Sequence, residues 1–395
     1  MKRKNIFKKI FGYLNLNDVG LIEIIFAFAL MLSGFSLLSF PLSLGIWIVL
    51  IAIIFLQGKN GKTHFYYPLL LFIIYWLFHT LGIMIVDKVN IFGIIEHLIL
   101  FLSIFVIYPT LNLSKLKGSL NWVAIIAISG LVYQWGIIGS GGMVHQLEIP
   151  GLSLSAETLE RISVRPSSFF QEPAAYTAFM MCPLAFSLID KKYIWTIVMI
   201  MSIFLTTSTT GIFVSFIMLF VSLINHRKLN KKTIFFVGLI IVSSFFALTR
   251  FEAFEYGMEK LEDTDYESNV RITQGPYVVG TMEAGEYVFG VPYSSAYNYC
   301  KSGRALSVST YGKSVYMSTF WMMLLLYGVV GLVLYLNVYY RIFKKSRDTW
   351  PLIACLCGVL FSSGYGFGVF YTYTTIVLLA ISNGSKKVSQ SLKQT

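Results

Sequence analysis

Long apolar segments repeat along almost the whole chain and alternate with short polar ones. Most of them are long enough for a helix to cross a hydrocarbon core of about 30 Å. We therefore predict an all-α polytopic membrane protein with about twelve transmembrane helices, which form one integral membrane domain over residues 1–395. The predicted spans are 20–38, 42–56, 67–86, 91–108, 120–139, 172–189, 193–207, 210–225, 233–249, 316–340, 351–367 and 369–383.

The composition supports this class of fold. Hydrophobic residues make up 56% of the chain and charged residues only 13%, whereas a soluble domain contains about 25% charged residues. The division between the last two spans is the least regular feature of the pattern. Gly364, Gly366 and Gly368 either mark a turn there or allow close helix packing.

The distribution of Lys and Arg predicts the orientation in the membrane. If the N-terminus is cytoplasmic, 22 of the 31 basic residues fall in inner segments, and every inner segment is positive, as the positive-inside rule requires. Both termini are then cytoplasmic. The net charge of +12 is explained by contact with anionic lipid, so we expect no nucleic-acid partner.

Two of the outer connections are long, at residues 140–171 and 250–315, and all others are short. Long loops on a helical scaffold usually carry function. We therefore expect the chemistry of this protein on its outer face.

Arginine is concentrated on the predicted outer face. It supplies five of the nine outer basic residues but only four of the 22 inner ones. The guanidinium fork binds phosphate bidentately, so the group favours a pocket for pyrophosphate or another polyanion, although each Arg could instead pair with an outer carboxylate. The five are Arg161, Arg165, Arg250, Arg271 and Arg304.

Several other outer side chains could take part in chemistry. Glu172 precedes Pro173 and should lie at a helix N-terminus, either as a carboxylate stabilised by the helix dipole or as a general base. Tyr277 and Tyr293 belong to a tyrosine-rich second loop that could hold sugars or simply pack. The five His residues show no ligand spacing, and no phosphate-binding Gly-rich loop occurs, so we predict neither a metal site nor a cofactor.

Glu23 and Glu96 lie within predicted spans. An acid inside a membrane is costly and is often functional. Glu23 is near the cytoplasmic end and could reach the surface, whereas Glu96 could line a polar cavity or bind a neighbouring helix.

Three segments resemble elements of a known family. They are RPSSFFQEPAAY (165–176), SNVRITQGPYVVGTMEAGEYVFGVPYSSA (268–296) and MSTFWMMLLLYGVVGLVLYL (317–336). In order and spacing they resemble the O-antigen and capsular polysaccharide polymerases (Wzy type) of the O-antigen polymerase and ligase superfamily. The segment LTTSTTG (205–211) lacks the Arg that many relatives carry, and no His precedes the helix after the second loop. Both differences favour the polymerase branch over the ligase branch.

The resemblance implies a membrane glycosyltransferase with a GT-C-like architecture in the bacterial plasma membrane. Such an enzyme joins undecaprenyl-pyrophosphate-linked repeat units without a nucleotide or metal, and works with a flippase and a chain-length regulator. The motifs identify Arg165, Glu172 and Arg271 as candidate catalytic residues. Arg161 and Arg304 are candidates only because of their charge and their predicted outer location. The alternatives are a lipid-linked oligosaccharide flippase or other transporter, and a ligase-type glycan transferase.

The orientation can be tested directly. Tags inserted at residue 145 or 285 should react with a membrane-impermeant reagent in intact cells stripped of their wall, because both positions lie in predicted outer loops. Labelling of these tags only from the cytoplasmic side would contradict the orientation and the outer location of the chemistry.

Overall fold

The structure, a computed structural model, describes residues 12–36, 43–58, 63–86, 91–154, 165–225, 270–293, 295–301, 315, 317–362 and 368–391. The protein is all-α over these residues, with 14 α-helices, short 3₁₀ turns and one ribbon of two-residue strands. The α-helices are α2 (Leu21–Met31), α3 (Leu44–Gly58), α4 (Tyr67–Val86), α5 (Ile91–Ile107), α6 (Leu113–Gly139), α8 (Pro173–Ile189), α9 (Tyr193–Leu205), α10 (Thr209–Asn225), α13 (Val270–Gly280), α14 (Ala284–Phe289), α15 (Ala296–Cys300), α16 (Thr319–Lys345), α17 (Trp350–Ser362) and α18 (Val369–Ser391).

Eleven of the predicted spans coincide with helices, and the twelfth, 233–249, lies outside the described residues. Three helices, α4, α6 and α16, are long and apolar enough to cross a membrane, and several shorter helices are also apolar. Together these apolar helices indicate a membrane protein. The last two predicted spans are separate helices, α17 and α18, and residues 363–367 between them lie outside the described residues.

The first predicted span is wrong at its end. The helix α2 stops at Met31, and the chain continues through a 3₁₀ turn (Leu32–Gly34) into strand β1 (Phe35–Ser36). This strand pairs antiparallel with β2 (Ser153–Leu154) of the first long loop. A side chain at Gly34 would lie 3.0 Å from the Gln146 amide, so the apolar run leaves the helix to contact the loop.

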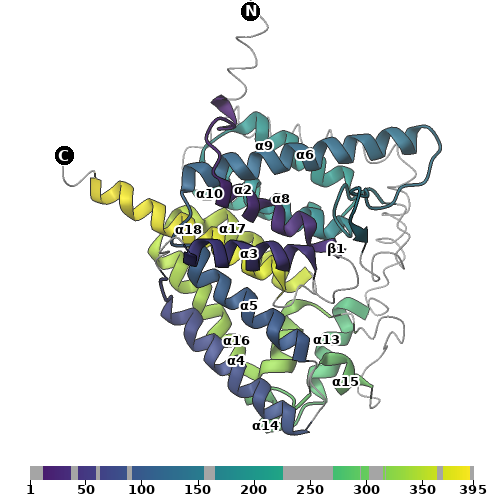
Figure 1. Cartoon of the computed structure of the whole chain (residues 1–395). Helices are drawn as coiled ribbons and strands as arrows, with labels where there is room; N and C mark the ends of the chain where they lie inside the picture. The colour runs from purple at the N-terminus through teal and green to yellow at the C-terminus, as the bar shows by residue number, and fades with distance from the viewer. Residues whose placement is uncertain are drawn as a thin grey trace, which may run out of the picture.

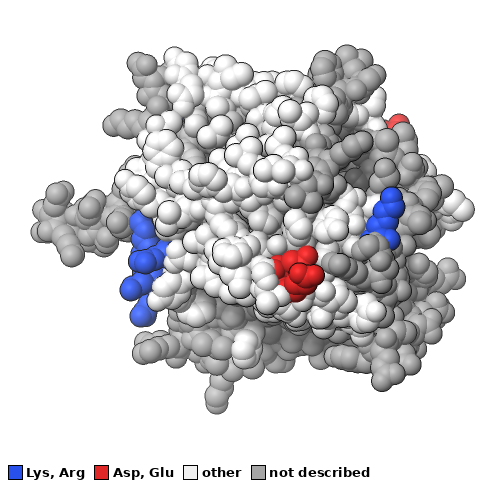
Figure 2. Space-filling view, turned by 90° about the horizontal axis from the view of Figure 1, so that it is seen from below, with Lys and Arg blue, Asp and Glu red and all other residues white. Residues whose placement is uncertain are grey.

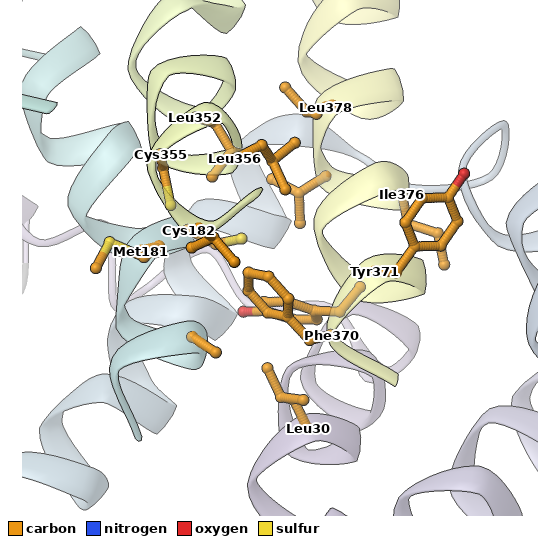
Figure 3. Close-up of a cluster of buried hydrophobic side chains, with 14 of the residues drawn as sticks. Leu30, Met181, Cys182, Leu352, Cys355, Leu356, Phe370, Tyr371, Ile376 and Leu378 are labelled. Carbon is orange, nitrogen blue, oxygen red and sulfur yellow. The ribbon is translucent and has the colours of Figure 1, made fainter. Parts of the chain in front are cut away.

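The helices form a bundle, and different elements lie at its two ends (Figure 1). Strand β1, α13 and α15 lie at one end, and the C-terminus extends from the other. The helix α16 packs against α4, α17 against α10, and α8 against α9. Buried side chains of α2, α8, α17 and α18 form a common core, as Figure 3 shows for Leu30, Cys182, Leu356 and Phe370.

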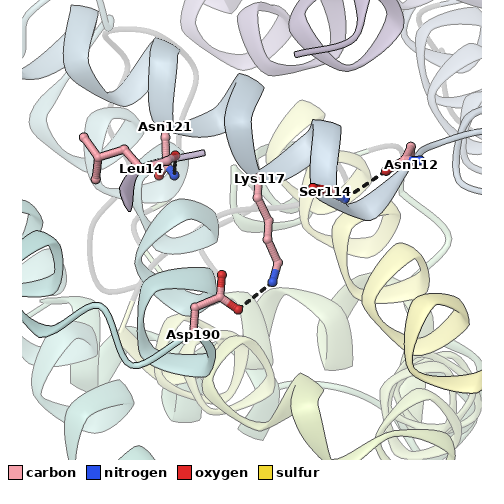
Figure 4. A network of polar contacts seen from close by, with 6 residues as sticks. All are labelled: Leu14, Asn112, Ser114, Lys117, Asn121 and Asp190. Carbon is pink, nitrogen blue, oxygen red and sulfur yellow. Dashed lines mark hydrogen bonds and ion pairs between the residues drawn. The ribbon is translucent and has the colours of Figure 1, made fainter. Parts of the chain in front are cut away.

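Polar contacts join three segments at the end predicted to be cytoplasmic (Figure 4). Lys117 of α6 forms an ion pair with Asp190 after α8 at 2.5 Å. Asn121 of α6 donates to the Leu14 carbonyl oxygen and accepts from Trp195 of α9. Segments predicted to share one side of the membrane therefore lie together.

At this end Glu23 has a structural partner, and Lys192 has a lowered pKa. Glu23 is 5% exposed, and its Oε1 accepts a hydrogen bond from the Asn112 backbone N–H at 2.8 Å. Asn112 in turn caps α6 by accepting from the Ser114 and Lys115 N–H groups. Burial lowers the pKa of Lys192, an effect that Asp190 opposes and Lys117 reinforces. Glu23 thus anchors the start of α6, which begins seven residues earlier than predicted because Asn112 caps it.

Candidate functional site

The first motif segment is anchored to the C-terminal end of α6 by one buried amide. Gln134 is 1% exposed, and its Oε1 accepts hydrogen bonds from the Ser167 and Ser168 N–H groups at 3.0 and 2.6 Å. Its Nε2 donates to the His145 carbonyl oxygen at 2.6 Å. The side chain therefore ties both ends of the 140–171 loop to one helix.

Further contacts hold the same segment in place. The Leu147 N–H donates to the Ser168 carbonyl oxygen at 2.8 Å, and Gln146 Nε2 donates to that of Phe169 at 2.7 Å. Ser168 has a positive φ of 58°. A Cβ at Gly130 of α6 would lie 2.4 Å from Ser168 Oγ, so this glycine allows the segment to approach the helix closely.

The predicted position of Glu172 is confirmed: it is the N-cap of α8, and Pro173 is the first helical residue. Its side chain accepts no capping hydrogen bond from α8, so the carboxylate is not used as a side-chain cap. Just before it, buried Phe170 packs against Tyr176 and Phe179 of α8 at ring distances of 5.4 and 5.5 Å. Arg165 and Glu172 are both half-buried at the two ends of this anchored segment.

The second motif begins in α13, whose first turn contains Arg271. The side chain of Arg271 lies outside the described part, as do Arg161, Arg304 and most of the first half of the 250–315 loop. A Cβ at Gly275 would lie 2.3 Å from the Trp321 ring, so α13 packs closely on the first turn of α16. The backbone that carries Arg271 is thereby positioned against the bundle.

The second and third motifs fit into each other. Residues Phe289, Gly290 and Val291, here called the Phe289 turn, follow α14, and Gly328 interrupts α16 with φ 62° and ψ −172°. A Cβ at Gly290 would lie 2.2 Å from the Leu326 oxygen, and one at Gly328 would lie 2.3 Å from the Val288 oxygen. Both glycines also have positive φ, so both the space and the backbone conformation require glycine.

A tyrosine of α4 completes this junction. Tyr75 Oη lies 2.8 Å from the carbonyl oxygens of both Phe289 and Tyr327, so its single O–H is shared between them. The Val291 N–H donates to the Leu325 oxygen at 2.9 Å. His79 packs one turn further along α4, with its ring 5.4 Å from that of Tyr327.

The remaining candidates of the 250–315 segment differ in exposure. Tyr277 is 46% exposed on α13, whereas Tyr293 packs edge-on against Tyr299 at 5.6 Å. Glu283 and Glu286 form a capping box at the start of α14. Their carboxylates therefore have a structural role, while the sugar-binding role of the two tyrosines stays a prediction.

Cys300, the candidate metal ligands and Glu96 complete the description of the chemistry-bearing side chains. Cys300 of α15 is buried, and burial raises the pKa of its thiol to about 11, so it is protonated near neutral pH. Within the described ranges, no three His, Cys, Asp or Glu residues lie together as a metal-binding group. Glu96 is half-buried, and the neighbouring His97 contacts the Gly93 oxygen and stacks on Trp76.

Gln134 and Tyr75 were not singled out from the sequence. Each is a polar side chain within a long apolar run, and this was the signal in the sequence that could have identified them.

Comparison with protein-family models, curated proteins and solved structures finds no match for this chain.

The anchoring role of Gln134 can be tested by graded substitution. Gln134→Leu should lower the melting temperature in detergent and expose the 140–171 loop to protease, because the buried N–H groups of Ser167 and Ser168 lose their acceptor, at about 1–3 kcal/mol each, and the His145 carbonyl oxygen loses its donor. Gln134→Glu keeps the acceptor for Ser167 and Ser168 and should cause a smaller loss. A Gln134→Leu variant with wild-type melting and protease protection would contradict this role.

Proposed function

We propose that this protein polymerises lipid-linked oligosaccharide repeat units into a capsular, O-antigen or other extracellular polysaccharide. The observation that carries the proposal is the junction of the second and third motif segments. The Phe289 turn and the interruption of α16 at Gly328 are far apart in the sequence, yet each needs glycine because of the other. Such mutual fit supports the view that the motifs are parts of one site.

The proposed setting is the outer face of a bacterial plasma membrane. Twelve spans with both termini cytoplasmic would place the 140–171 and 250–315 segments outside, in a GT-C-like arrangement. The inner ends of α6 and α8, which contact each other through Lys117 and Asp190, carry the positive segments that support this orientation. Gln134 lies toward the opposite end of α6, where it holds the first motif.

The proposed reaction exchanges one bond at a sugar carbon. A hydroxyl of the acceptor repeat unit attacks the anomeric carbon of the donor, and the bond from that carbon to the phosphate oxygen breaks. Undecaprenyl pyrophosphate leaves with the electron pair, and the hydroxyl proton passes to a base. The bond to the leaving pyrophosphate supplies the driving force, so no nucleotide is consumed.

Three residues are assigned to these steps. Arg165 and Arg271 would hold the donor pyrophosphate and stabilise the negative charge that develops on it. Glu172 would accept the proton or orient the base, a role supported by its half-buried position at the N-cap of α8, at the end of the anchored first motif. Arg161, Arg304, Tyr277 and Tyr293 would contact the remainder of the two substrates.

Substitutions of these residues test the proposal in vesicles supplied with lipid-linked repeat units. Wild-type protein should lengthen the glycan on its lipid carrier, also in excess EDTA. Arg165→Lys and Arg271→Lys should each slow polymerisation by about 100-fold, because Lys keeps the charge but loses the bidentate fork. Glu172→Gln keeps the size of the side chain and should abolish chain extension.

Matched controls separate catalysis from folding. Glu283→Gln changes a carboxylate at another N-cap, and Arg347→Lys changes an Arg near the inner end of α16; both should retain wild-type rates. Near-normal polymerisation by Glu172→Gln or by both Arg variants would remove these assignments. Translocation without elongation would instead indicate a flippase or transporter, and transfer to a new acceptor would indicate a ligase-type enzyme.

A further inference from the structure

The exposed side chains of α4 form one continuous apolar stripe. Their spacing of three or four residues places them on a single face of the helix. They are Tyr67, Leu71, Ile74, Phe78, Leu81 and Ile85, and the last is 87% exposed. A second stripe follows α16 beyond its interruption, at Val329, Val333, Leu336 and Tyr340. Faces of this kind on helices long enough to cross a membrane contact lipid.

The end of α14 contacts both α4 and α16. Its last residues, Tyr287, Val288 and Phe289, are exposed, and Phe289 is 60% exposed. Their backbone is held from both sides, by Tyr75 of α4 and by close contact with Gly328 of α16. Figure 2 views the molecule from the side of α14; most of the described residues on this face are uncharged, with basic residues toward two edges and acidic residues in the middle and near one edge.

The register of the helices places this junction deep along the bundle. Tyr75 lies ten residues before Ile85, the last residue of the apolar span of α4, which corresponds to about 15 Å along the helix. Gly328 lies nine residues after Thr319, the first residue of α16, or about 14 Å. One leaflet of the hydrocarbon core is about 15 Å thick.

The chain descends to this depth and returns. Gly275 of α13 packs at the level of Trp321, the Phe289 turn reaches Gly328, and Val291 is hydrogen-bonded to Leu325. Glu283 and Glu286 mark the start of the descent, where the capping box begins α14. The segment 283–291 therefore runs into the bundle alongside α16 and returns alongside the same helix.

Several backbone polar groups of the turn and of the interruption are paired, as irregular backbone at membrane depth requires. The Gly290 N–H donates to the Glu286 oxygen at 2.7 Å, and the Val291 N–H donates to the Leu325 oxygen. The Phe289 and Tyr327 oxygens share the Tyr75 hydroxyl. The turn can therefore occupy an apolar environment without unpaired carbonyls at these positions.

We propose that residues 283–291 form a re-entrant segment in the outer leaflet. Phe289 and Val288 contact phospholipid acyl chains in continuity with the α4 and α16 stripes, and Glu283, which α14 places about 9 Å from Phe289, lies nearer the headgroups. This inference rests on the exposure, register and hydrogen bonds of these residues, and it does not depend on the proposed enzymatic reaction.

Photolabelling of the wild-type protein tests this placement. The protein is reconstituted with phospholipids that carry a diazirine near the middle of one acyl chain, and labelled peptides are identified by mass spectrometry. Residues 284–291 should be labelled to the same extent as the exposed stripe of α4. Labelling of α4 and α16 with only background on 284–291 would overturn the proposal.

Spin labels provide the second measurement and locate individual side chains. In a variant whose four native Cys are replaced, single cysteines are introduced as Phe289→Cys, Glu283→Cys and Phe78→Cys and are labelled in nanodiscs. A label at 289 should be relaxed mainly by oxygen, which partitions into hydrocarbon, as at 78; a label at 283 should be relaxed mainly by a water-soluble nickel complex. Equal nickel accessibility at 289 and 283 would show that water or another protein segment covers the turn.

Discussion

A helix that is interrupted inside a membrane must find new hydrogen-bond partners for the backbone groups that it frees. In this protein α16 is interrupted at Gly328, and the partners come from two distant parts of the chain. In the Phe289 turn, the Val291 N–H donates a hydrogen bond to the Leu325 oxygen, and the Tyr75 hydroxyl is shared between the Tyr327 and Phe289 oxygens. The packing of the second motif depends on this pairing, because it sets where α14, and hence the end of α13, meets the bundle.

The first motif segment follows the same principle with a different side chain. Gln134 supplies one acceptor and one donor that link the 140–171 loop to α6, much as Tyr75 links the Phe289 turn to α4. In both cases a polar residue in an apolar helix binds backbone rather than another side chain. Such fixed frames suit electrostatic catalysis, which requires charged groups to be positioned before charge develops.

The apolar pattern was sufficient to predict most helices, since the length and polarity of a transmembrane helix are set locally. The junctions were not predictable in the same way. Nothing near Tyr75 in the sequence indicates that its partners are Phe289 and Tyr327, more than 200 residues away. Likewise, hydropathy could not show that α2 would end at Met31, because the pairing of Phe35 with Leu154 decides it.

In the candidate site, too, features set by neighbouring residues were predictable, and features set by distant residues were not. The N-cap position of Glu172 follows from the adjacent Pro173 and was predicted. The structural role of Glu23 was not, because its partner is the backbone of Asn112 at the start of α6. The packing of Tyr293 on Tyr299 also depends on how the loop folds.

The most direct test of the account is the position of a bound donor. A cryo-electron microscopy map of the protein in nanodiscs with an undecaprenyl-pyrophosphate-linked repeat unit should show the pyrophosphate at the outer face, in contact with the guanidinium groups of Arg165 and Arg271. Pyrophosphate density at the inner face, or at an outer position away from both arginines, would contradict the account.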